Sequence, residues 1–354
     1  MSALRAPKSA GKVRPARLTD LAALGELSRL CQSDGADTRS LGLPVNGPPI
    51  GVFSLFRLPL GAFRPNDLMY VYEEQGHIAG LVRVERESVR DEWTIVELDA
   101  VGMANAGDIR YRLVQLLLRE GAKRGAARFH VACADADDNV ELLMQAGFMR
   151  YGEEQILFRS DERALPPPWT EPRAQTARIR TTTSQDALAL SRLYAQATPQ
   201  PVTRLESYRL ADWERQGGHL RVPRSSLTPI LRFADVEGFV QTTVDGGRDG
   251  TALDAYLQVG VAKEDQPHYL KVVARPEADV SDLIDFGLGV IAAQTKGGDR
   301  RQDRGVIAPV RTYESPIDRR MEDAGFDSIA SVTLLMKETL VRVAEPALVP
   351  AGVR

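Results

Sequence analysis

The 354-residue chain repeats itself at an offset of roughly 170 residues. The segments 13–20 and 179–186 each lead from a strand-like run through Thr or Ser and then Asp into an apolar helical pattern. Further along, the segment 142–148 ends in Ala-Gly-Phe, and the segment 320–326 ends in the same three residues. A repeat this long indicates a duplicated domain rather than a solenoid.

Prolines mark the boundary between the two copies. Pro166, Pro167, Pro168 and Pro172 fall within 161–177 and favour extended chain over helix or sheet. We therefore expect a first domain at 1–160, a Pro-rich linker at 161–177, a second domain at 178–345 and a C-terminal tail at 346–354.

The first half shows the clearer pattern of elements. Ile109, Leu113, Leu116 and Leu117 recur at helical spacing, and Gly147 stands where a left-handed helix end favours glycine. The expected elements are a strand at 12–17, a helix at 19–31, an irregular stretch at 33–66, strands at 68–74, 77–87 and 92–103, a helix at 107–124, a strand at 127–133, a helix at 137–146 and a closing strand at 148–159.

The second half is expected to repeat this order, with one surplus strand. Its expected elements are a strand at 178–181, helices at 185–197 and 204–216, strands near 228–234 and 237–244, the surplus strand at 253–260, a strand at 268–274, a helix at 280–293, a strand at 305–310, a helix at 315–324 and closing strands at 326–342. The fold class is α/β (α+β), in which each half is a mixed, mostly antiparallel twisted sheet flanked by helices.

Composition excludes several classes of partner. Lys and Arg total 45 against 48 Asp and Glu, and neither half is strongly basic, so a nucleic acid is not expected. Cys31, Cys133 and four scattered His provide neither a disulfide framework nor zinc spacing, and we expect no metal. The longest apolar run, 283–293, is too short to span a bilayer, and residues 1–17 lack the apolar core of a secretory signal. A cytoplasmic protein without a membrane partner is expected.

The order strand, helix, two or three antiparallel strands, then strand-helix-strand-helix-strand resembles the GNAT N-acetyltransferase superfamily. The resemblance occurs twice, and each copy ends its last helix in Gly-Phe. The tandem arrangement is similar to two-domain members of that superfamily. The resemblance implies acetyl-CoA as cosubstrate, held in a splay between two parallel strands, and an amine of a small molecule or peptide as acceptor.

The resemblance also implies where acetyl-CoA would lie. It places the pantetheine along 101–103 and the pyrophosphate on the backbone N–H groups that open the long helix, so that the contact residues are Val101, Met103, Gly107, Asp108, Ile109 and Arg110. The sequence departs from the family's glycine-rich pattern here, since Asp108 and Arg110 stand at the glycine positions. Asp108 would repel a pyrophosphate, whereas an acid in a first helical turn is itself stabilising. The equivalent segment of the second half, 275–280, also lacks both glycines.

Glu97 is the candidate catalytic residue. By the resemblance it lies near the position of a general base on the third strand, and Asp99 follows two residues along on the same face. The alternative interpretation is a solvated strand face. The family's tyrosine acid is replaced by Leu143 in the first half and by Met321 in the second.

Two functional hypotheses remain open. The first is an acyl-CoA-dependent N-acyltransferase that uses the first half, with the second half as a degenerate support. The alternative is a non-catalytic tandem protein that binds a small molecule or has a structural role. The segment 41–65, with five Pro and three Phe, is expected either to cover an acceptor pocket or to pack against the other half.

Overall fold

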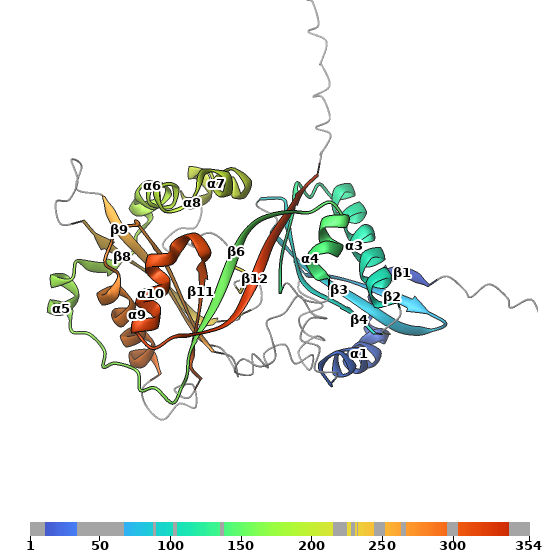
Figure 1. The fold of residues 1–354 in the computed structure, drawn as a ribbon, viewed down its shortest axis with the longest axis horizontal. Helices are drawn as coiled ribbons and strands as arrows, with labels where there is room; N and C mark the ends of the chain where they lie inside the picture. Colours follow the sequence, from blue (N-terminus) through green and yellow to red (C-terminus); the bar gives the residue numbers. More distant parts are fainter. Residues whose placement is uncertain are drawn as a thin grey trace, which may run out of the picture.

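The computed structural model describes residues 11–33, 67–87, 90–101, 105–134, 138–214, 225–227, 231, 233–243, 252–262, 267–295 and 304–339. Within these ranges, twelve strands form a single sheet in the order β1-β2-β3-β4-β5-β12-β6-β11-β10-β9-β8-β7. Only the pairs β4·β5 and β10·β11 are parallel, and the other neighbours are antiparallel. Helices lie against the sheet in both halves (Figure 1). The expected mixed, mostly antiparallel architecture is therefore confirmed. The segment 41–65 lies outside the described residues.

The first half follows the expected order closely. Both residues of the β2–β3 turn, Gln75 and Gly76, have positive φ, as a two-residue hairpin turn requires. The elements of this half are β1 (Lys12–Pro15), α1 (Leu21–Ser33), β2 (Asp67–Glu74), β3 (His77–Glu87), β4 (Glu92–Ala100), α3 (Ala106–Lys123), β5 (Arg128–Cys133), α4 (Asn139–Gln145) and β6 (Met149–Arg159).

The second half differs from the expectation in three places. Two strands were expected near 228–234 and 237–244, but the structure has one strand at 233–242. The strand at 253–260 is therefore not surplus. The helix expected at 204–216 is two short helices separated at Ser207, which has φ of 46°. The linker contains a short helix. The elements are α5 (Glu171–Thr176), β7 (Ile179–Thr181), α6 (Ala187–Ala197), α7 (Gln200–Glu206), α8 (Leu210–Glu214), β8 (Phe233–Thr242), β9 (Leu253–Ala262), β10 (His268–Ala274), α9 (Ser281–Gln294), β11 (Val306–Arg311), α10 (Ser315–Asp323) and β12 (Asp327–Glu338).

The start of each repeat is built in the same way. In the first half, both terminal nitrogens of Arg14 contact the carboxylate of Asp20, at 2.6 and 2.9 Å. In the second half, Arg180 contacts Asp186 at 2.8 and 2.6 Å. Each Asp also accepts the backbone N–H three residues before it and so caps the helical turn that follows. The repeat seen in the sequence is therefore also a repeat of side-chain contacts.

The ends of the last helices also match. Gly147 and Gly325 have φ of +90° and +88°, a conformation in which any other L-residue is strained. The N–H of the following Phe bonds to the carbonyl five residues earlier, at 3.0 Å in both halves. This is the Schellman ending expected for a helix that stops at glycine.

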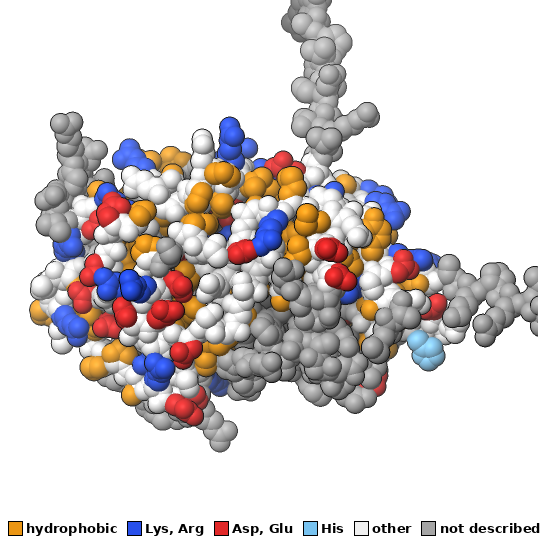
Figure 2. All heavy atoms as spheres, in the orientation of Figure 1, with side chains coloured by type: hydrophobic (Ala, Val, Ile, Leu, Met, Phe, Trp, Pro, Cys, Tyr) orange, Lys and Arg blue, Asp and Glu red, His pale blue; other side chains and the backbone are white. Residues whose placement is uncertain are grey.

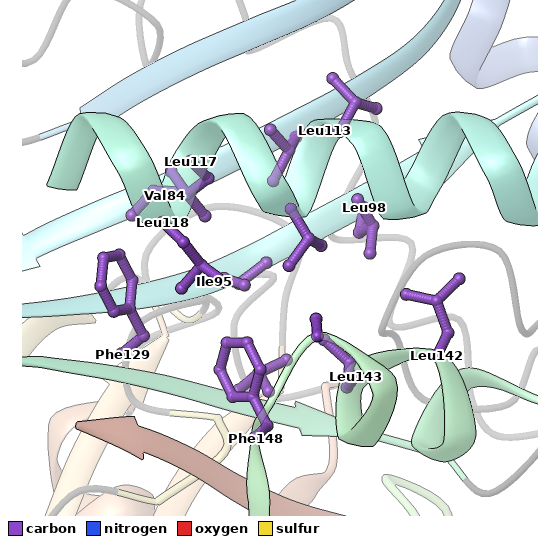
Figure 3. Packing of buried hydrophobic residues seen from close by; sticks show 14 of the residues in the cluster. Val84, Ile95, Leu98, Leu113, Leu117, Leu118, Phe129, Leu142, Leu143 and Phe148 are labelled. Atoms are coloured by element: carbon purple, nitrogen blue, oxygen red, sulfur yellow. The ribbon is translucent and has the colours of Figure 1, made fainter. Parts of the chain in front are cut away.

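The core of the first half lies between α3, α4 and one face of the sheet. Leu113 and Leu117 of α3 are fully buried against the strands, and Leu143 of α4 and Phe148 close the same cluster (Figure 3). These side chains account for the helical spacing in the sequence, because residues three and four apart share one helix face. Acidic and basic side chains are interleaved on the face of the second half shown in Figure 2.

The last strands of the two halves are exchanged. β12, which ends the second half, pairs with β5 of the first half, with Met336 opposite His130. β6, which ends the first half, pairs with β11 of the second half, with Ile307 opposite Phe158. β6 and β12 also pair with each other and form the centre of the sheet (Figure 1).

Candidate active site

Two neighbouring parallel strands separate in the first half. β4 and β5 are paired from Glu92 opposite Arg128 to Ile95 opposite Val131, and the ladder between them ends there. β4 continues to Ala100 with every residue buried, while it remains paired with β3 on its other side. A gap between two parallel strands leaves backbone groups without strand partners, which a bound ligand can satisfy.

A β-bulge lies in β4 at the point of separation. Arg83 of β3 is opposite Glu97, but Val84 is opposite Ile95, so Val96 has no opposite residue. Bulges redirect the side chains that follow them and are frequent beside active sites. Here the bulge places Glu97 and Asp99 on the face opposite the α3 core.

Glu97 and Asp99 form a buried acidic pair. Glu97 is 8% exposed, and its Oε2 accepts a hydrogen bond of 2.8 Å from Nε of Arg83. Asp99 is 3% exposed, and its Oδ1 has no hydrogen-bond partner within the described ranges. The alternative interpretation, a solvated strand face, is wrong because both carboxyls are buried.

The two carboxyls differ in their electrostatic surroundings. Burial raises the pKa of Asp99 well above its usual range, and the negative charge of Glu97 raises it further. The positive charges of Arg83 and Arg110 lower it by smaller amounts. Asp99 therefore keeps its proton to a higher pH than an ordinary Asp side chain does. Arg83, the counter-ion of Glu97, is the part of this arrangement that the sequence alone did not single out.

The N-terminus of α3 is open. Asn105 precedes the helix and makes no side-chain capping bond, and the first intrahelical bond runs from Ile109 N–H to Asn105 O at 3.0 Å. Gly107 is exposed, and no atom of the described residues lies within 4 Å of the position that a Cβ would take. Helix N–H groups without an internal acceptor attract anions.

The charged residue of this turn has its own partner. Asp108 is more than half exposed and pairs with Arg112 one turn later, at 2.8 Å. The pairing offsets part of the repulsion that an approaching anion would meet, although both groups are screened by solvent.

Arg110 and Ile109 point toward the interior. Arg110 is 8% exposed, and its Nη1 donates a hydrogen bond to Oδ1 of Asn139 on α4. Ile109 is 3% exposed and lies so close to Gly80 that a Cβ there would be 2.5 Å from its methyl group. Ile109 is thus a core residue, and any contact with a ligand would come from its backbone.

The remaining residues expected to contact a cofactor lie just before α3. Val101 donates its N–H to Ala79 O at 3.0 Å and packs beside Leu24 and Leu81. Met103 lies outside the described residues. Leu143 and Met321, which stand where the resemblance expects tyrosine, are buried in the two cores at 1% and 0% exposure. Neither of them can supply a proton.

The second half has the same strand geometry but fills its gap with a buried ion pair. β10 and β11 pair only at His268 and Tyr269 before they separate. Nζ of Lys271 on β10 donates to the carbonyl of Pro309 on β11 at 3.1 Å and contacts Glu314 at 2.8 Å. The side chains of Lys271 and Glu314 are 4% and 5% exposed. Lys271 therefore bridges the two strands where the first half leaves them apart.

The N-terminus of α9 is also occupied. Oδ1 of Asp279 accepts the N–H of Ser281 at 3.1 Å and its hydroxyl at 2.7 Å. An acidic cap takes the place of an external anion and repels one. The second half thus differs from the first at both the strand gap and the helix N-terminus.

A second buried charge network joins the halves. Arg311 of β11 contacts Glu154 of β6 at 3.0 Å and Glu206 of α7 at 3.1 Å. Glu206 also accepts from the hydroxyl of Tyr194 at 2.5 Å, and Glu154 accepts the N–H of Ser226 at 2.8 Å. Sequence reasoning missed this network because its members are far apart in the chain.

The described residues contain neither a metal-binding cluster nor a membrane-spanning helix. No group of three or more His, Cys, Asp and Glu in these ranges is arranged to hold a metal ion. No helix in the described part of the chain is long and apolar enough to cross a membrane.

Comparison with known proteins connects the chain to a fold. No protein-family model matches it, and no curated protein matches it. A solved tandem GNAT protein from the clavulanic acid biosynthesis pathway, determined without AcCoA, is 13% identical with a TM-score of 0.53, covering 93% of this chain and 98% of that one. A GCN5-related N-acetyltransferase from Sphaerobacter thermophilus is 15% identical with a TM-score of 0.53, covering 93% and 96%. The chain has a tandem GNAT fold, as its sequence pattern predicts.

Proposed function

We propose that this chain, which has a tandem GNAT fold, is an acyl-CoA-dependent N-acyltransferase whose first half performs the reaction. The observation that carries the proposal is the gap between β4 and β5, which has the buried Glu97–Asp99 pair beside it. The acceptor in the proposal is an amine of a small molecule or peptide. A fold alone does not determine chemistry, so the proposal depends on this site.

The residues of the first half fit an acyl-CoA cosubstrate. The N–H groups at 106–108 open α3 without a side-chain cap and would hold the pyrophosphate. Acetyl-CoA supplies a thioester carbonyl as the electrophile. Asp108 is the feature that opposes this fit, and its pairing with Arg112 reduces the opposition. The unpaired part of β4, before Val101, would lie along the pantetheine.

The acidic pair would prepare the amine for attack. An acceptor amine is protonated at neutral pH, and its lone pair becomes nucleophilic only when a base removes a proton. We assign this role to the pair, in which Glu97 accepts a hydrogen bond from Arg83 and burial raises the pKa of Asp99. The amine would then attack the thioester carbonyl, its nitrogen would lose a second proton to solvent, and the C–S bond would break to release CoA thiolate.

The leaving thiolate must take its proton from water. Leu143 is buried at the position where the resemblance expects an acid. General acid catalysis contributes about 10²–10⁴-fold, so we expect slow turnover even with a well-placed amine. The second half would act as a support, because Lys271 and Asp279 occupy the positions that acetyl-CoA would need.

Calorimetric titration of the full chain with acetyl-CoA tests the first part of the proposal. We expect one binding event per chain, because within the described residues only the first half offers an open gap and helix end. Two equal events would contradict the assignment to one half. No binding would support the alternative of a non-catalytic tandem protein.

Acetyl transfer from acetyl-CoA to a panel of amines, measured through the release of free CoA, tests the chemistry. We expect Asp99→Asn and Glu97→Gln to lower kcat by at least about tenfold while acetyl-CoA affinity is kept, because each variant removes a base and keeps its shape. Glu237→Gln is the matched control, since Glu237 on β8 also has a pKa raised by burial but lies in the second half. An unchanged kcat in both site variants would exclude the pair as the base.

A further inference from the structure

A cavity lies at the opposite end of the second half's strands from their gap. It has a volume of about 410 Å³ and is bounded by the end of β6, the starts of β10 and β11, the last part of α9 and the proline linker. Its lining includes Arg159, Arg163, Leu165, His268, Ala292 and Val306. Neither the proposed acyl-transfer site nor the buried Arg311 network uses any of these residues.

Arg159 is a buried cation without an acidic partner. It is 8% exposed, and none of the carboxylates in the described ranges lies within 4.0 Å of its nitrogens. It donates to three backbone carbonyls: Nε to Ala324 at 3.1 Å, Nη1 to Arg163 at 2.7 Å and Nη2 to Ala164 at 2.8 Å. A guanidinium has five N–H donors, so two remain. Carbonyls satisfy hydrogen bonds but do not neutralise a buried charge.

The nearest charges do not compensate Arg159. Burial lowers its pKa, the positive charge of Arg163 lowers it further, and Asp285 opposes these effects only weakly. Arg163 itself is half exposed and 3.4 Å from Asp327. Asp161 also lines the cavity, but it is exposed to solvent, where its charge is screened. A bound anion would provide the missing counter-charge.

The walls of the cavity are fixed in place. Gly305 has φ of +59°, and a Cβ there would lie 2.7 Å from the carbonyl of Arg159, so only glycine fits this turn. The prolines at 166–168 have fixed φ, and the linker packs on α9, where a Cβ on Gly289 would be 3.3 Å from Pro167 O. Trp169 then stacks edge-on to Phe286 of α9 at 5.8 Å. A preformed cavity avoids much of the cost of ordering on binding.

We propose that this cavity binds a small organic carboxylate. Its volume is in the range of small-molecule sites and is much larger than an inorganic ion fills. Arg159 would bind the carboxylate with its two remaining N–H groups, and Leu165, Ala292 and Val306 would contact an apolar body. Prolines cannot donate backbone N–H groups, so the wall at 166–168 favours the apolar part of the ligand. The site extends beyond the proposed function, because it is distant from the β4–β5 gap.

Calorimetry on the full chain at low salt tests the proposal, with benzoate and octanoate as probes. Benzamide, which has the shape of benzoate without its charge, tests the need for an anion, and inorganic phosphate tests the need for an apolar body. Arg159→Gln removes the cation. Ala292→Phe fills the cavity and leaves Arg159 in place. Arg150→Ala is the control, because Arg150 also lies on β6 but is not among the residues that line the cavity and is paired with Glu153.

We expect benzoate or octanoate to bind, and benzamide and phosphate to bind at least about tenfold more weakly. Arg159→Gln and Ala292→Phe should each weaken carboxylate binding by about 10- to 100-fold, while Arg150→Ala leaves it unchanged. Far-ultraviolet circular dichroism identifies a variant that fails to fold, and Ala292→Phe then carries the test. Equal binding of benzoate and benzamide, unchanged affinity in folded Ala292→Phe, preference for phosphate, or no carboxylate binding at millimolar concentration would each overturn the proposal.

Discussion

The buried pair that closes the gap in the second half makes a quantitative prediction. Lys271 and Glu314 are 2.8 Å apart with side chains 4% and 5% exposed. Glu314→Gln keeps a side chain of the same shape but leaves Lys271 with no carboxylate beside it. Removing one partner of a buried pair destabilises a protein by about 3–5 kcal/mol, because the remaining charge is uncompensated. We expect a loss of this size in the free energy of unfolding.

The double variant Lys271→Met/Glu314→Gln should recover much of that loss. Replacing a buried pair with uncharged groups is often neutral or stabilising, since neither desolvated charge remains. The chain also offers a matched exposed pair, because Lys123 and Glu120 are separated by the same 2.8 Å with side chains 71% and 24% exposed. Exposed helix pairs contribute about 0.3–0.5 kcal/mol, so Glu120→Gln should have little effect.

Urea unfolding followed by circular dichroism measures all four proteins, and linear extrapolation gives their free energies. A Glu314→Gln variant that loses no more stability than Glu120→Gln, or a double variant less stable than Glu314→Gln, would refute this account of Lys271. Either result would mean that the gap in the second half is hydrated and that Lys271 does not close it.

Two further predictions concern the first half. Burial raises the folded-state pKa of Asp99, so the wild type should lose stability as the pH rises from the ordinary Asp pKa through that raised value. In urea titrations, Asp99→Asn should weaken this pH dependence and increase stability at neutral pH. A steeper pH dependence in the variant would contradict the expected sign. Asp108→Asn should tighten acetyl-CoA binding about 2- to 5-fold at low salt, and the effect should fade at high salt. Glu120→Gln, at the other end of α3, should leave acetyl-CoA binding unchanged. Weaker binding in Asp108→Asn would argue against this helix end as the phosphate site.

Local patterns in the sequence predicted most of the elements correctly. The Gln75-Gly76 turn and the Gly147 helix end follow from backbone conformations that few residues tolerate, so the sequence marks them directly. The exchange of β6 and β12 was not predictable in this way, because alternation identifies a strand and its faces but not its neighbours. The helix expected at 204–216 divides at Ser207, next to Glu206, whose side chain is held by Arg311 from another element.

The candidate site was predictable only in part. Position along β4 indicated Glu97 and Asp99, but the ion pair of Glu97 with Arg83 depends on the β3–β4 register, and the raised pKa of Asp99 depends on its burial. The closure of the second gap by Lys271 depends on Glu314, which lies 43 residues further along the chain. The sequence does not mark Arg159 for any role, and its burial follows from the way the linker packs over the end of β6.

The exchanged strands also constrain the order of events during synthesis. β5 lies in the first half, yet its neighbour β12 is made much later, and the pair Arg128 and Glu338 is 210 residues apart in sequence. At about 5–20 residues per second, a ribosome needs roughly 10–40 s to make that interval. Throughout it, the emerging first half has a completed β5 with one unpaired edge, the kind of edge that recruits other chains. Slow translation of the second half would therefore increase the exposure of the first half to misassembly, and a chaperone that shields β5 would matter most during that interval.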